Sequence, residues 1–109
     1  NVQIIGASAF ADCTNLKRVD LPAGLTMIDG LAFARCESIE TLVIPAGVST
    51  LSYNVFDNSG LREIVFEGDA PQFDEHTFHA VTATAYYPEA NKTWTSAVMQ
   101  NYGGRIAWE

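Results

Sequence analysis

The sequence predicts a repeat solenoid, a fold in which similar short units stack along one axis. Two observations lead to this prediction. A phenylalanine recurs at intervals of 23, 23 and 22 residues, as Phe10, Phe33, Phe56 and Phe78. The residues around each phenylalanine recur with it, and both cysteines of the chain fall in equivalent phrases, AFADC and AFARC. A unit of about 23 residues cannot bury its own apolar face, so successive units must stack.

Length and composition fit one small folded domain. Of the 109 residues, 48% are hydrophobic and 17% are charged, as in globular chains. A net charge of −7 repels phosphate backbones and anionic lipids, so we expect no nucleic-acid partner. No apolar run approaches the roughly 20 residues that span a bilayer, so no membrane insertion is expected. The chain starts partway through a unit without a signal peptide, and we expect it to be a fragment of a longer protein.

Each unit is predicted to have two walls. The phrases GASAFADC and GLAFARC form one wall, as turns or a short helical stretch whose phenylalanine points inward and stacks on its copies. The phrases LKRVDLP, IETLVIP and LREIVFE alternate apolar and polar residues, which indicates a strand with one buried face. Stacked copies predict a parallel sheet. Pro22 and Pro45 close two strands where a missing N–H costs no ladder bond.

The pattern covers roughly residues 2–88, as about 3.5–4 repeats of 23 residues. The predicted units lie near residues 2–24, 25–47, 48–69 and 70–88. Residues 89–109 have no repeat phrase and are predicted to be a C-terminal cap that shields the last unit. In this cap, Trp94, Val98 and Tyr102 have the spacing of one apolar face of a short helix. RIAWE is a candidate for a last strand.

The recurring phrase IG..AF..C..L..V.LP resembles the BspA-like leucine-rich repeat, also called the Treponema-type repeat. Residues 28–48, IDGLAFARCESIETLVIPAGV, are close to a consensus unit. The third unit departs from it, with Ser59 in the cysteine column, one residue missing before Leu61 and Glu67 in place of proline. The resemblance implies a right-handed, leucine-rich-repeat-like solenoid and a bacterial protein that is extracellular or on the cell surface.

The cysteines are equivalent residues of neighbouring units, which places them about 4.8 Å apart. That distance is within the Cα range of a disulfide, but parallel Cβ vectors do not converge as a disulfide requires. Ser59 occupies the equivalent position in the third unit, which favours a position that accommodates small buried side chains. Free thiols are therefore expected, with a disulfide as the alternative. Two stacked thiols do not supply the four ligands of a structural metal site.

No catalytic, cofactor or metal site is expected. DEHTFH, residues 74–79, is the one cluster of metal-type ligands, and His76 and His79 would share a face if it were helical. A metal would need a further ligand, so we expect a solvated loop beside Phe78. Nucleophile-elbow, dinucleotide-binding and phosphate-loop phrases are missing from the sequence, so the chain is predicted not to be an enzyme.

The outward face of the predicted sheet is the candidate partner-binding surface. It has two outward columns, which are Arg18, Thr41, Glu63 and Thr84, and then Asp20, Val43, Val65 and Tyr86. An apolar row with a polar rim is a plausible contact site, although strand propensity alone also places β-branched residues there.

The resemblance implies a non-enzymatic adhesion or protein-interaction module. Its partner would be a protein, from a host or the extracellular matrix, or a component of the cell wall. A structural spacer and an accessory domain of a larger extracellular enzyme are the alternatives.

Overall fold

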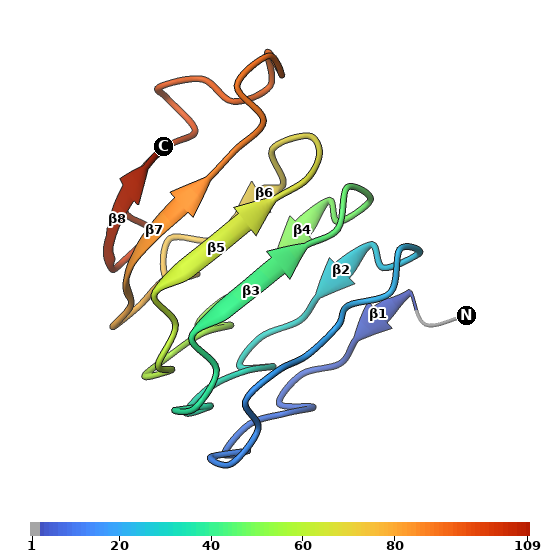
Figure 1. The fold of residues 1–109 in the computed structure, drawn as a ribbon, viewed down its shortest axis with the longest axis vertical. Coiled ribbons are helices and arrows are strands. Elements are labelled where there is room, and N and C mark those ends of the chain that lie inside the picture. Colours follow the sequence, from blue (N-terminus) through green and yellow to red (C-terminus); the bar gives the residue numbers. More distant parts are fainter. Residues whose placement is uncertain (1–2) are drawn as a thin grey trace.

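The computed structural model describes residues 3–109 as a solenoid of about five turns. Every strand pair is parallel, and the described residues contain no helix (Figure 1). The strands are β1 (Ile4–Ile5), β2 (Met27–Ile28), β3 (Thr41–Ile44), β4 (Thr50–Leu51), β5 (Glu63–Phe66), β6 (Gln72–Phe73), β7 (Thr82–Tyr86) and β8 (Arg105–Trp108). The predicted repeat solenoid with short parallel strands is confirmed.

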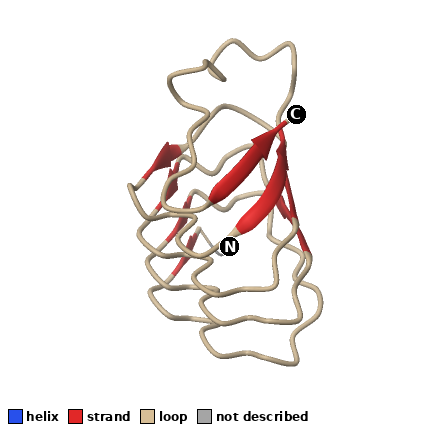
Figure 2. Cartoon of the chain, turned by 90° about the vertical axis from the view of Figure 1, so that its left-hand side faces the viewer, coloured by secondary structure: helices blue, strands red, loops and turns tan. Residues whose placement is uncertain are grey.

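The strands form two sheets on separate walls of the coil (Figure 2). One has the order β3-β5-β7-β8 and contains two of the three strands that the apolar–polar alternation predicts, in IETLVIP and LREIVFE. The other has the order β1-β2-β4-β6, with two residues in each strand. This second sheet was not predicted, because a two-residue strand is too short to show alternation. Its pairing nevertheless follows the repeat, since Ile5 lies opposite Ile28, and Ile28 opposite Leu51.

The phenylalanines stack along the axis as the repeat predicts. The ring centroids of Phe10 and Phe33, Phe33 and Phe56, and Phe56 and Phe78 are 5.2, 6.1 and 5.9 Å apart, with the rings within 14° of parallel. The last three rings are buried, and Phe10 is half-buried in the first turn. This wall consists of turns rather than helix.

The strand expected in the first unit, within LKRVDLP, does not form, and this part of the prediction is wrong. Residues 16–22 contain no strand, and no backbone hydrogen bond joins them to β3. The same unit does bond to the next one elsewhere, for example from Ser8 N–H to Gly30 C=O at 2.9 Å and from Thr26 N–H to Gln3 C=O at 2.7 Å. The first two turns are therefore joined at other walls but not at the wall of the larger sheet.

The short helix expected in the cap is also wrong. Residues 89–102 form separate turns, in which Trp94 N–H bonds to Asn91 C=O and Val98 N–H to Thr95 C=O. The Asn91 side chain accepts the Thr93 N–H at 2.9 Å, and such side-chain bonds compete with a helix. A single i→i−4 bond within this stretch, from Met99 to Thr95, is too little to propagate a helix.

The C-terminal end of the coil is covered by aromatic rings instead. Trp94 packs on Phe66 with ring centroids 4.8 Å apart, and Tyr102 stacks on Phe73 at 4.5 Å. β8 follows and pairs in parallel with β7, at the position of the candidate last strand. The boundary between repeats and cap at residue 88 remains a prediction, and residue 2, where the first unit was expected to begin, lies outside the described residues.

Candidate functional site

The outward columns of the sheet are in register in the structure. Thr41 lies opposite Glu63, and Glu63 opposite Thr84. In the second row, Val43 lies opposite Val65, and Val65 opposite Tyr86. We call this second row, Val43–Val65–Tyr86, the apolar row. Val43 is 42% exposed and Tyr86 37% exposed, with Val65 half-buried between them.

Arg18 and Asp20 lie outside this sheet. They belong to residues 16–22, which do not pair with β3, although both side chains are exposed. Arg18 Nε contacts Asp20 Oδ1 at 3.4 Å. The structure therefore brings together six of the eight residues of the predicted surface and leaves these two as a neighbouring pair.

Glu63 links the two rows. Its carboxylate accepts from Tyr86 OH at 3.3 Å and lies 3.5 Å from Thr41 Oγ1. Partial burial raises the pKa of Tyr86, and the carboxylates of Glu63 and Glu109 raise it further, since a phenolate is disfavoured beside a negative charge. At neutral pH the phenol is thus protonated and donates to Glu63.

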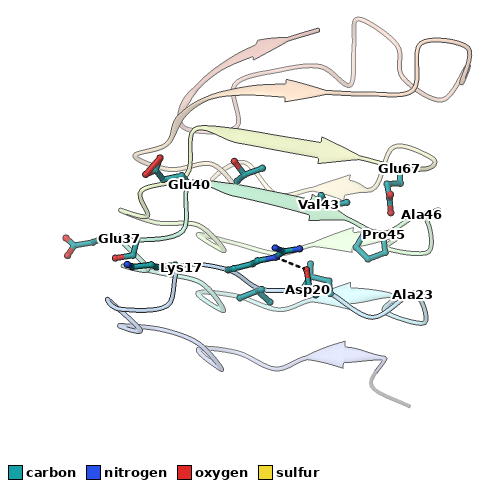
Figure 3. Close-up of a pocket in the computed structure, with 14 residues that line it drawn as sticks. Lys17, Asp20, Ala23, Glu37, Glu40, Val43, Pro45, Ala46 and Glu67 are labelled. Carbon is teal, nitrogen blue, oxygen red and sulfur yellow. Dashed lines mark hydrogen bonds and ion pairs between the residues drawn. The ribbon is translucent and has the colours of Figure 1, made fainter.

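A cleft lies between residues 17–23 and β3 (Figure 3). Its volume is about 1110 Å³, and it is lined by residues of both segments and of the loops that flank β3 and follow β5. The charged lining residues are Lys17, Arg18, Asp20, Glu37, Glu40 and Glu67. This cleft was not predicted, because it exists where a predicted strand pair fails to form.

Both cysteines are free in the structure. The Cys36 thiol is fully buried and donates to the Phe10 carbonyl oxygen at 2.9 Å, whereas Cys13 is half-buried in the first turn. Burial raises the pKa of Cys36, because the charged thiolate is disfavoured away from water. The column therefore serves packing, as the Ser59 substitution indicates.

This difference predicts unequal thiol reactivity in the native protein. Ellman's reagent at pH 8 is expected to modify Cys13 within minutes and to leave Cys36 unmodified until denaturant is added, since the thiolate is the reactive form. Absorbance and intact mass measure the two steps. In the Cys13→Ser variant, native reactivity should disappear. Equal rates for the two thiols in the folded wild type would contradict this assignment.

The DEHTFH segment closes a turn. Asp74 Oδ2 accepts the His76 N–H at 3.0 Å, and His79 Nδ1 lies 2.8 Å from Asp57 Oδ1. The rings of His76 and His79 are 6.1 Å apart and nearly perpendicular. Over residues 3–109, no three or more histidine, cysteine or carboxylate side chains are arranged to hold a metal ion.

Comparison with known proteins identifies the repeat. The family model described as BspA type leucine rich repeat region, with 6 copies, matches residues 1–100. No curated protein and no solved structure matches the chain. The part of the chain that the structure describes has no helix long and apolar enough to cross a membrane.

Leucine-rich repeats of this kind are in general protein-interaction modules without enzymatic activity, and the family is typical of bacterial surface or secreted proteins. The match spans nearly the whole coil, including the turns in which the phenylalanines stack. The chain belongs to the BspA-type leucine-rich repeat family.

Proposed function

We propose that the chain is a non-enzymatic adhesion module of a bacterial cell-surface or secreted protein, and that it binds a protein through the outward face of the β3-β5-β7-β8 sheet. The observation that carries this proposal is the apolar row. Its side chains occupy one register on three adjacent strands, and two of them are exposed at 42% and 37%. The family supports a protein partner.

The surroundings of the row suit recognition of a protein. The three strands are held by parallel ladders on a buried core, so the face is preorganised and loses little entropy on binding. Tyr86 offers a large ring with a polar tip, a residue type enriched among binding hot spots. Its hydroxyl donates a hydrogen bond to Glu63 Oε2 at 3.3 Å, which orients it. The Glu63 carboxylate can accept further hydrogen bonds from donors of a partner.

Charging the apolar row should remove binding. In the triple variant Val43→Glu, Val65→Glu, Tyr86→Glu, loss of a hot-spot cluster worth about 2 kcal/mol or more should weaken binding at least roughly 30-fold. Surface plasmon resonance against a panel of extracellular-matrix proteins and purified cell wall measures this. Circular dichroism and thermal melting establish that the variant is folded.

The matched control is Ile4→Glu. Ile4 is 55% exposed in β1, on the other sheet, so a glutamate there changes charge and apolar exposure without touching the apolar row. It should bind as wild type. Unchanged binding by the triple variant, or an equal loss with Ile4→Glu, would refute the proposed face, and an absence of any ligand would favour a spacer.

A further inference from the structure

β3 is the edge strand of the larger sheet, and one side of its backbone is open. Glu40 C=O accepts from Glu63 N–H at 3.0 Å and Ile44 C=O from Glu67 N–H at 3.1 Å, so the even-numbered residues face β5. In a parallel ladder, alternate residues direct N–H and C=O to opposite sides. The main-chain groups of Thr41 and Val43 therefore point away from β5, toward residues 17–23.

No backbone bond from residues 17–23 meets those groups. Between them lies the cleft of about 1110 Å³ (Figure 3). Its wall is apolar along the strand, at Val43, Pro45 and Ala46, and across from it at Ala23. An open strand edge beside an apolar wall is the arrangement to which an extended peptide adds as a further strand, with main-chain bonds supplying affinity.

The charge of the cleft indicates the chemistry of that peptide. Four carboxylates and two basic side chains line it, and one of the basic groups, Arg18, already contacts Asp20 at 3.4 Å. Figure 3 shows Glu37 and Glu40 toward one end and Glu67 toward the other. The cleft is thus acidic within a chain of net charge −7, which attracts a positively charged segment and accelerates its association.

We propose that this cleft binds an extended, lysine- or arginine-bearing segment of a partner protein, which pairs with the main chain of Thr41 and Val43. The proposal deepens the proposed function by naming a class of partner, but it rests on the edge of β3 rather than on the outward face. A second copy of this chain is a poorer occupant, since two chains of charge −7 repel each other.

The probe is an acetylated and amidated pentapeptide in which lysine alternates with valine, and its matched control replaces lysine by glutamate. Titration into the ¹⁵N-labelled chain should shift the amide signals of residues 17–23 and β3, and slow hydrogen exchange at Thr41 and Val43. The lysine peptide should bind at least roughly tenfold more tightly than the glutamate peptide, and salt should weaken it. Equal affinities, or no binding of the lysine peptide, would overturn the proposal.

Variants separate the edge from the face. Val43→Pro removes the outward N–H, a change that edge strands tolerate, and should weaken binding of the lysine peptide roughly tenfold. Val43→Ala shortens the same side chain but keeps the N–H, and should weaken binding clearly less. Tyr86→Glu impairs the face alone and should leave peptide affinity unchanged. If Val43→Pro does not fold, the double variant Glu40→Lys, Glu67→Lys replaces it and should lose the same tenfold. Wild-type peptide affinity in the folded edge variants, or a dimer with the Thr41 amide already protected, would rule the proposal out.

Discussion

Phe56→Ala is expected to lower the free energy of unfolding by about 3–5 kcal/mol. Phe56 is 1% exposed and lies between Phe33 and Phe78, with ring centroids 6.1 and 5.9 Å away. Truncation removes the transfer free energy of the ring and leaves a cavity between two turns that the backbone ladders hold apart. Urea denaturation followed by circular dichroism measures the change.

Phe10→Ala is the matched comparison, because Phe10 belongs to the same stack of phenylalanine rings but has one stacked neighbour where Phe56 has two. It is half-buried and stacks on Phe33 alone, at 5.2 Å. Its truncation should cost clearly less than that of Phe56. Because a solenoid couples mainly adjacent units, Phe56→Ala should also reduce the slope of the unfolding free energy with urea if the two halves separate. A cost for Phe56→Ala no larger than that for Phe10→Ala would show that the stack does not carry the stability.

The stacking of the units along one axis was predictable because one position of the repeat, the phenylalanine, recurs at a nearly constant interval. Phe10, Phe33 and Phe56 are spaced by the period itself, and stacking requires only that successive turns be alike. The outward rows were predictable for the same reason, since the offset from Val43 to Val65 and from Val65 to Tyr86 is the ladder register.

The errors occurred where one pattern fits two structures. Trp94, Val98 and Tyr102 have helical spacing, yet Trp94 and Tyr102 are apolar because they cover Phe66 and Phe73 from separate turns. Residues 16–22 alternate like a strand, yet a strand exists only where a neighbour accepts its hydrogen bonds. The cleft beside β3 exists because residues 16–22 do not pair with that strand, so no local pattern in the sequence predicts the cleft.

Gly60→Ala is expected to lower the free energy of unfolding by about 3 kcal/mol, at the upper end of overpacking effects. The third unit lacks one residue before Leu61, and its chain takes the shorter path by lying close to the second unit. Gly60 N–H donates to Cys36 C=O at 3.2 Å, and a Cβ on Gly60 would lie 2.2 Å from the carbonyl oxygen of Glu37. A main-chain atom cannot rotate away as a side chain does, so the two turns must separate.

Gly6→Ala isolates this steric cause. A Cβ on Gly6 would meet no atom within 4 Å, and alanine restricts the unfolded chain, so this change should leave the free energy of unfolding within about 1 kcal/mol of wild type. Thermal and urea denaturation of both variants give the comparison. If Gly60→Ala lowered the free energy of unfolding no more than Gly6→Ala does, the close approach of the two turns would not be what accommodates the missing residue. A different backbone path elsewhere in the third turn would then have to accommodate it.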